Sequence, residues 1–212
     1  MASTKFQKKS TARYKKEKKG KSCAFKAVMA FAVIIILSAI AIALCTSVIS
    51  DTTKNLELAA YPKEYTQYVE KYAREYKVDE NLIYSVIDTE SNFNEEAVSP
   101  VGAVGLMQIM PETFDWLLEI QGRQGEYSQE DLFSPDVNIE FGTYYLSMLL
   151  DSFESESTAV AAYNAGQGKV SQWLADTQYS SDGVSLDYIP YDETANYVNK
   201  VLYAKSKYES LY

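Results

Sequence analysis

The chain has 212 residues, carries a formal net charge of −9 and contains no histidine. The lack of histidine excludes Ser-His-Asp triads, Cys-His peptidases and the common histidine-ligated zinc sites. The charge is unevenly divided, because residues 1–26 carry a net charge of +9 and the remainder carries −18. An acidic remainder argues against a nucleic-acid partner, since binding to nucleic acid depends on basic side chains.

Residues 27–50 form an uncharged, mostly apolar run of 24 residues. At about 1.5 Å of rise per residue, such a helix spans a bilayer core of roughly 30 Å. The run is longer than the apolar part of a cleavable signal, so we expect a retained anchor, with cleavage near Ala41-Ile42-Ala43 as the alternative. Because basic flanks stay cytoplasmic, the pattern predicts a single-pass cell-membrane protein with a cytoplasmic tail at 1–26 and an extracytoplasmic domain.

Both cysteines, Cys23 and Cys45, fall in the tail and the anchor. The outer domain therefore has neither a disulfide nor a thiol nucleophile. Leu44 precedes Cys45 where a lipoprotein signal has a small residue, so we do not expect lipidation. A basic arm for nucleic acid is an alternative role for the tail, but its position beside the span favours anchoring.

The outer domain is predicted to cover residues 61–212, after a short polar linker at residues 51–60. It opens with five tyrosines at steps of three or four residues, which predict one face of a helix: Tyr61, Tyr65, Tyr68, Tyr72 and Tyr76. Such a stripe usually faces a core, so packing is the expected role and a sugar-stacking platform is the alternative.

Helices follow one another through the rest of the chain. Asp79 is predicted to cap a helix that runs to Glu90. Further helices are expected to begin at Pro111 and at Ser134-Pro135-Asp136, and to cover residues 157–164, 170–174 and about 192–208, with Gly166 and Gly168 breaking the chain before Val170. No run alternates as a strand does. The sequence therefore predicts an all-α fold, a single helical domain behind one transmembrane helix.

Glu90 ends the apolar stripe of its helix. A buried carboxylate is costly when ionised, so it is either paired or held protonated near neutral pH, where it can act as a general acid. The alternative is a glutamate at a fraying helix end that meets water. The glycine-containing, mostly apolar segment 99–111 favours the first interpretation, because its glycines allow a close backbone approach to a ligand in a cleft and Gln108 supplies a polar group.

Three motifs resemble those of the soluble-lytic-transglycosylase-like (SLT) domain family, whose fold is lysozyme-like. The first consists of Glu90-Ser91-Asn92-Phe93, Ala97-Val98-Ser99-Pro100 and the run from Gly102 to Thr113. The second is Ala162-Tyr163-Asn164-Ala165-Gly166 with Gly168 and Val170. The third is Ile189-Pro190-Tyr191 with Glu193-Thr194 and Tyr197-Val198. The motifs occur in the family's order, and the resemblance covers roughly residues 78–204.

The resemblance assigns roles by position. It implies that Glu90 is the catalytic acid and base, and that Tyr163 orients or polarises it. It implies sugar-binding roles for a further set of residues: Ser99, Met107, Gln108, Asn164 and Tyr197. The alternative for Tyr163 is a packed ring whose hydroxyl bonds to the backbone. No metal-ligand spacing occurs, and we expect neither a metal nor a cofactor.

The resemblance and the single nominated carboxylate together predict the reaction. Ordinary glycosidases use two carboxylates about 5 to 10 Å apart, whereas only Glu90 is nominated here. We expect a bacterial lytic transglycosylase that cuts the glycan strands of peptidoglycan and is held to the membrane through residues 27–50. The alternatives are a lysozyme-type muramidase, a non-catalytic wall-binding module, and the wall-loosening part of an envelope-spanning assembly.

Overall fold

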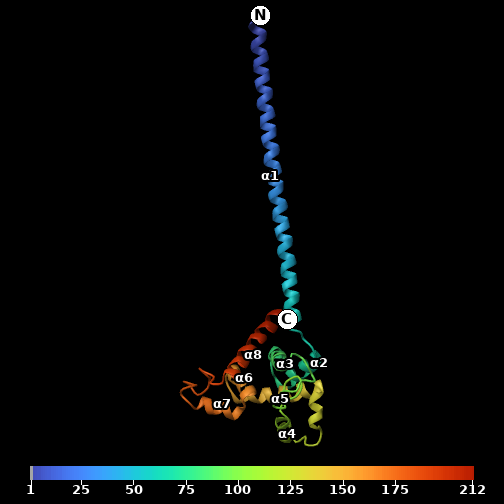
Figure 1. The fold of residues 1–212 in the computed structure, drawn as a ribbon, viewed down its shortest axis with the longest axis vertical. Helices are drawn as coiled ribbons and strands as arrows, with labels where there is room; N and C mark the ends of the chain where they lie inside the picture. Colours follow the sequence, from blue (N-terminus) through green and yellow to red (C-terminus); the bar gives the residue numbers. More distant parts are fainter. Residues whose placement is uncertain (1) are drawn as a thin grey trace. The chain divides into compact units, whose positions relative to one another are not determined.

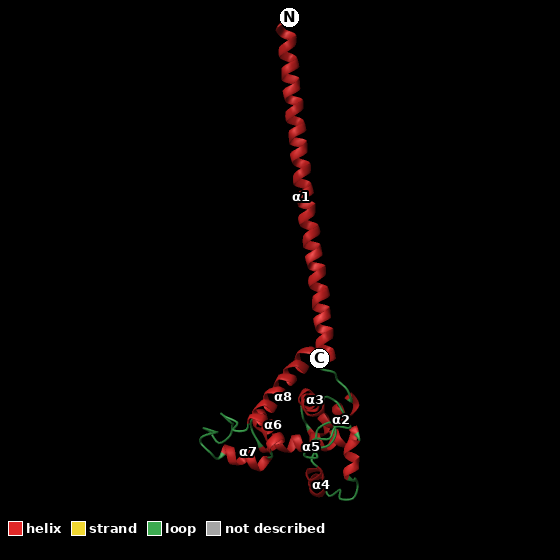
Figure 2. Ribbon diagram, viewed as in Figure 1, coloured by secondary structure: helices red, strands yellow, loops and turns green. Residues whose placement is uncertain are grey.

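The computed structural model describes the backbone of residues 2–212 and the side chains of residues 25–212. The chain divides into two compact units, Met1–Leu56 and Glu57–Tyr212. The first unit consists of helix α1, Ala2–Ala60, up to Leu56, and the second contains the last residues of α1, seven further α-helices and a short 3-10 helix (Figure 1). Residues 2–212 contain only isolated β-bridges and no strand, which confirms the predicted all-α fold (Figure 2). Side chains of the basic tail, Cys23 among them, lie outside the described residues.

Helix α1 contains the one segment of the described chain that is long and apolar enough to cross a membrane, Phe25–Ala60. Its apolar side chains, such as Phe31 and Leu44, are exposed on every face, which is typical of a helix that lipid surrounds. Residues 51–60, predicted as a linker, are helical and continue α1. Their Lys, Leu, Glu and Ala residues are good helix formers, and the polar composition therefore does not end the helix.

The tyrosine-rich start of the second unit is only partly helical. Helix α2, Thr66–Tyr76, begins later than the tyrosine spacing predicts, because Tyr65 at its N-cap has a left-handed backbone with φ of 53°. Tyr61 and Tyr65 therefore precede the helix. Tyr72 is buried, and the other four tyrosines pack against the core, so packing rather than a sugar platform is confirmed.

The next helices begin where their capping residues predict. Helix α3, Glu80–Ser91, is capped by Asp79, whose carboxylate accepts a hydrogen bond of 2.9 Å from Asn81 N. Proline at the first turn starts both α4, Pro111–Ile120, and α5, Pro135–Ser152. The sequence did not predict the 3-10 helix η1, Gln129–Phe133, which precedes α5.

Three helices complete the domain: α6, Glu156–Ala165; α7, Gln167–Leu174; and α8, Asp192–Leu211. Gly166, with φ of 87°, separates α6 from α7, as predicted. Gly168 lies inside α7 and does not break the chain.

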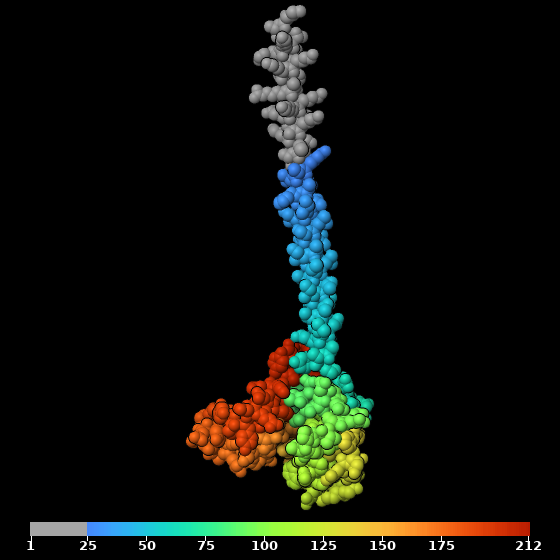
Figure 3. Space-filling view, in the orientation of Figure 1, coloured from blue at the N-terminus to red at the C-terminus, as the bar shows by residue number. Residues whose placement is uncertain are grey.

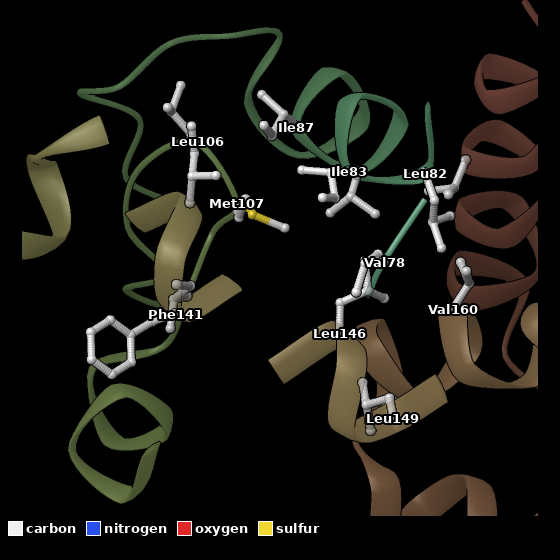
Figure 4. Close-up of a cluster of buried hydrophobic side chains, with 14 of the residues drawn as sticks. Val78, Leu82, Ile83, Ile87, Leu106, Met107, Phe141, Leu146, Leu149 and Val160 are labelled. Carbon is white, nitrogen blue, oxygen red and sulfur yellow. The ribbon is translucent and has the colours of Figure 1, made fainter. Parts of the chain in front are cut away.

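The core of the second unit forms where α5 packs against α2 and α6, and where α8 packs against α3 and α6. Figure 4 shows how the helices and one loop contribute to it. Ile83 and Ile87 project from α3, Leu146 and Leu149 project from α5, and Met107 enters from the loop before α4. This packing holds the end of α3, where Glu90 lies, against elements that come from distant parts of the sequence.

Candidate active site

Glu90 lies in the last turn of α3, directly before a sharp reversal of the chain. Asn92 and Phe93 both have a left-handed backbone, with φ of 50° and 61°. Residues other than glycine rarely adopt this backbone conformation. It persists only where packing with neighbouring residues stabilises it. Here Phe93 is buried, and its ring packs 6.5 Å from that of Tyr84. The reversal therefore fixes the end of α3 that carries the carboxyl group.

The Glu90 carboxyl group is partly buried and lacks a basic partner in the described part of the chain. Burial raises the pKa of Glu90 to about 7, because desolvation penalises the charged form, and the nearby Tyr197 hydroxyl partly offsets this by lowering the pKa. A carboxyl group with a pKa near neutral can both donate and accept a proton at that pH. Of the two states foreseen for Glu90, paired or held protonated by burial, the raised pKa corresponds to the second.

Two tyrosines approach Glu90 from different helices. Tyr197 of α8 is buried, and its hydroxyl approaches the carboxyl group without completing a hydrogen bond to any described residue. Tyr163 of α6 donates its hydroxyl proton to the Met107 carbonyl at 2.8 Å. Burial first, and the neighbouring Glu90 charge second, raise the pKa of both tyrosines well above 10. Both hydroxyls therefore stay protonated across the physiological range.

A cleft of about 260 Å³ lies beside Tyr163. In Figure 3 the domain is hollowed between the part that carries α6 and α7 (orange) and the part that carries α4 (yellow-green). Its lining comes from the loop before α4, the first turn of α4, α5 and the end of α6: Gln108, Ile109, Met110, Thr113, Tyr145, Tyr163, Asn164, Ala165 and Gly166. Three of the predicted site residues, Gln108, Tyr163 and Asn164, therefore share the cleft. Glu90 is not part of this lining. Tyr163 lines the cleft and is also a neighbour of Glu90.

Met107 and Ser99 are placed differently from the prediction. The Met107 side chain is completely buried in the core and does not line the cleft. Its contribution to the site is the backbone carbonyl that binds Tyr163. The Ser99 hydroxyl accepts a 2.9 Å hydrogen bond from Ala103 N and so closes a turn, away from the cleft lining. Met107 is an apolar side chain that adds to the core, whereas the Ser99 hydroxyl satisfies a backbone group of its own loop.

Gln108 lines the cleft but also stabilises its own loop. Its amide nitrogen donates to the carbonyls of Ala97 and Gly105, at 3.1 and 2.9 Å, so only the side-chain oxygen remains free for a ligand. Asn164 is exposed at the cleft, and its side-chain oxygen accepts a 2.8 Å hydrogen bond from the Thr194 hydroxyl. Asn164 thereby joins α6 to the first turn of α8.

The predicted reason for the glycines of this segment is only partly right. Gly105 has φ of 77°, and a side chain there would lie 2.2 Å from the Asn138 amide nitrogen and 2.5 Å from the Leu132 carbonyl. The close approach that requires glycine is therefore to α5 and η1 inside the domain, and not to a ligand. Gly102 has open space around it and φ of 91°, so it serves the turn.

Sequence reasoning missed three residues that shape the site. Tyr145 of α5 lines the cleft, and its ring lies 5.4 Å from that of Tyr163. Ser91 donates a 2.8 Å hydrogen bond to the Leu106 carbonyl and ties the end of α3 to the cleft loop. Asn138 is a buried amide on α5. An asparagine among apolar residues inside a predicted helix was a usable signal, whereas nothing marked Tyr145 among the many tyrosines.

The domain is thus a helical unit in which the partly buried carboxyl group of Glu90, without a basic partner among the described residues, lies near an aromatic cleft. The family described as "Transglycosylase SLT domain" matches residues 67–184, more than half of the chain. The chain belongs to this family.

Several known proteins of this family are similar to the chain. The soluble lytic murein transglycosylase of Escherichia coli K12 is 35% identical over 144 residues, which cover 67% of this chain and 22% of that protein. The membrane-bound lytic murein transglycosylase C of Actinobacillus succinogenes is 34% identical over 123 residues, which cover 54% of this chain and 34% of that protein. This chain therefore spans only about a fifth to a third of the length of these relatives.

Solved structures show the same relationship. The 70 kDa soluble lytic transglycosylase of E. coli superimposes with a TM-score of 0.62 at 30% identity, over 71% of this chain and 25% of that chain. An inactive glutamate-to-glutamine mutant of the lytic transglycosylase Slt of Pseudomonas aeruginosa gives a TM-score of 0.61 at 34% identity, with the same coverage. The lysozyme-like helical fold is therefore shared with these enzymes.

Proposed function

We propose that this protein is a peptidoglycan lytic transglycosylase. It cuts the β-1,4 bond from N-acetylmuramic acid to N-acetylglucosamine without water and leaves 1,6-anhydromuramic acid ends. The observation that carries this proposal is the state of Glu90, whose pKa burial raises to about 7 in a site without a basic partner among the described residues. One carboxyl group that is half protonated at neutral pH can serve both steps of such a reaction.

The lack of a second candidate carboxylate supports this reaction over ordinary hydrolysis. Glu95 accepts a 3.1 Å hydrogen bond from the Tyr65 hydroxyl, and Glu96, Glu112 and Glu193 are exposed. Asp88 lies in a separate hollow of about 270 Å³ with Tyr61, Thr89, Lys200, Tyr203 and Ala204. The residues that line the cleft beside Tyr163 include no aspartate or glutamate. A hydrolase of the two-carboxylate type would need one of these carboxylates to face the same glycosidic bond as Glu90.

Proton transfer through Glu90 balances over the two steps. The protonated carboxyl group donates to the bridging oxygen as the bond from that oxygen to C1 of muramic acid breaks. The acetamido oxygen of the same sugar stabilises the cationic carbon. The Glu90 carboxylate then takes the proton of the C6 hydroxyl while that oxygen bonds to C1, which restores the protonated acid. In this scheme Tyr163 and Tyr197 hold the carboxyl group in place, and Gln108 and Asn164 contact the sugars.

Product analysis tests the reaction type. Full-length protein in detergent, incubated with purified peptidoglycan, is expected to release muropeptides that are one water lighter than hydrolysis products and lack a reducing muramic acid. Proximity of the C6 hydroxyl to Glu90 favours this closure over attack by water. Products dominated by reducible ends would favour the lysozyme-type muramidase, and binding without any cleavage would favour a wall-binding module.

We infer that the protein is held in the cell membrane by residues 27–50, with residues 1–26 in the cytoplasm and residues 61–212 outside, joined through 51–60. The support is the apolar segment Phe25–Ala60 and the charge of +9 before it. A relative is described as membrane-bound.

Protease added to intact protoplasts is expected to remove the outer domain and spare the tail, and a protected domain would contradict this topology.

A further inference from the structure

Asn138 is a buried amide on α5 whose polar atoms are all engaged with the loop before α4 and its surroundings. The residue is 1% exposed. Its side-chain oxygen accepts a 2.8 Å hydrogen bond from Met107 N, and its nitrogen donates to the carbonyls of Val104 at 2.9 Å and Leu132 at 2.7 Å. Buried hydrogen bonds of this kind resist displacement, since a lost partner leaves a polar group without water.

Two glycines let the loop approach α5 at this point. A side chain at Gly105 would lie 2.2 Å from the Asn138 amide nitrogen, and one at Gly142 would lie 2.4 Å from the Met107 sulfur. Asn138 and Gly142 are four residues apart and therefore share one face of α5. This face sets the position of the loop from inside the domain, on the side away from any ligand.

The same loop residue that Asn138 holds also binds Tyr163. The Met107 backbone nitrogen donates a hydrogen bond to the Asn138 side-chain oxygen, and the Met107 carbonyl accepts one from the Tyr163 hydroxyl. Each hydrogen bond is 2.8 Å long. The preceding carbonyl, of Leu106, accepts the 2.8 Å hydrogen bond from Ser91, next to Glu90. A short chain of contacts therefore runs from α5 through Met107 to the hydroxyl beside the catalytic carboxyl group.

We propose that Asn138 is a positioning residue, which holds the Met107 carbonyl where it captures the Tyr163 proton and so leaves the Tyr163 oxygen facing Glu90. An oxygen lone pair accepts a hydrogen bond from a protonated carboxyl group but does not stabilise a carboxylate. Asn138 thus favours the acid form of Glu90 through Tyr163. The titratable groups that face Glu90 are Tyr163 on α6 and Tyr197 on α8, and Tyr145 on α5 faces Tyr163. As a role in catalysis, the proposal rests on the proposed function.

An NMR test reports on the environment of the Tyr163 hydroxyl and does not require enzymatic activity. In full-length protein in detergent micelles with tyrosine labelled at the ζ carbon, the Tyr163 signal is assigned by its loss in Tyr163→Phe. Asn138→Ala is expected to shift this signal, because the hydroxyl loses its fixed acceptor. Leu149→Ala, a buried change on the same helix roughly 16 Å further along it, is the matched control and is expected to leave the signal in place. Figure 4 shows Leu149 well apart from Met107.

A double-mutant cycle tests the catalytic consequence. Asn138→Ala is expected to lower kcat per folded molecule about tenfold with little change in KM, and to move the basic limb of the kcat profile to lower pH. The freed Tyr163 proton can then stabilise the Glu90 carboxylate, which lowers its pKa. In a Tyr163→Phe background Asn138→Ala is expected to cause no further loss, since both changes act through one contact. Leu149→Ala is expected to leave kcat per folded molecule within twofold in both backgrounds.

The outcomes separate the two proposals. An unshifted Tyr163 signal, or equal and additive losses from Asn138→Ala and Leu149→Ala, overturns the positioning role. A shifted signal in a protein that cuts no peptidoglycan supports the positioning of Tyr163 and overturns the proposed function. If Asn138→Ala does not fold, Gly142→Ala replaces it, because its added methyl group displaces Met107 while the Asn138 amide stays intact. The same signal shift and the same non-additivity with Tyr163→Phe are then expected, and their absence overturns the proposal.

Discussion

Glu90 on α3 and Glu140 on α5 are both largely buried glutamates, but the fold surrounds them in opposite ways. Glu140 forms an ion pair with Arg123, and the Tyr72 hydroxyl lies 3.2 Å from its other oxygen. Arg123 also binds Glu126 within the loop after α4, so its pair with Glu140 ties this loop to α5. Glu90 has no basic partner in the described part of the domain, and the titratable groups that interact with it there are the hydroxyls of Tyr163 and Tyr197.

The difference shows how one residue type serves stability in one place and chemistry in another. A buried carboxylate with a guanidinium partner holds two segments together through charge-assisted hydrogen bonds. A buried carboxyl group without a cation is costly to ionise, which raises its pKa to the range where proton transfer in both directions is easy. Four predictions on three substitutions, from the largest expected effect to the smallest, test this contrast.

Glu90→Gln is expected to lower the rate of peptidoglycan cutting by at least about a thousandfold, which corresponds to about 4 kcal/mol of transition-state stabilisation. It removes the titratable proton at nearly constant volume, so the circular dichroism spectrum should not change. Glu95→Gln is the matched control, because Glu95 is also half-buried beside a tyrosine hydroxyl, and its rate should stay near that of the wild type. A near-normal rate for Glu90→Gln would require a different acid.

Glu90→Gln should also stabilise the fold at high pH. The folded-state pKa of Glu90 is about 7, above its ordinary value of 4.5, so the stability associated with the protonated form is complete below pH 4.5 and is lost as the pH rises through 7. Removing the carboxyl group should therefore add at most about 3 kcal/mol to the free energy of unfolding at pH 8 and nothing at pH 4. Urea denaturation at both pH values measures this, and an equal effect at the two would contradict the raised pKa.

Tyr163→Phe is expected to leave a weak residual activity, about a hundredfold below that of the wild type, or about 2.7 kcal/mol. The change deletes the hydroxyl that lies beside Glu90 and is bound to the Met107 carbonyl. Tyr145→Phe is the control, since its ring packs next to Tyr163 and lines the same cleft. Initial rates on purified peptidoglycan compare the two variants, and equal losses would show that the Tyr163 hydroxyl matters no more than a neighbouring hydroxyl of the cleft.

Glu140→Gln is expected to cost about 2 kcal/mol of stability without changing the rate per folded molecule. It leaves Arg123 without its buried partner, and the partial exposure of Arg123, at 25%, reduces the penalty below that of a fully buried pair. Urea denaturation should show a much smaller change for Glu126→Gln, which removes the exposed partner of the same arginine. A loss of activity larger than the loss of folded protein would place Glu140 in the chemistry after all.

Local signals in the sequence determined much of this molecule. Apolar length identified α1 as a candidate span, and Asp79 and the two helix-starting prolines placed α3, α4 and α5. The apolar stripe that ends in Glu90, together with the family motifs, nominated Glu90 as the candidate acid. These features depend on composition, spacing and capping within one element, which a single sequence displays directly. The start of α2 was misplaced because the left-handed conformation of Tyr65 leaves no mark on the tyrosine spacing.

Tertiary structure alone decided what surrounds each side chain. Periodicity could not show that Met107 turns into the core while its carbonyl binds Tyr163, or that Gly105 is required by the amide of Asn138. Nor could it show that Glu140 finds a guanidinium and Glu90 does not. The contacts that form join residues from 17 to 56 positions apart in the chain. The state of Glu90 depends instead on the lack of a basic partner among the described residues. Burial and pairing are properties of the packed domain, and they set the pKa of Glu90, on which the proposed chemistry depends.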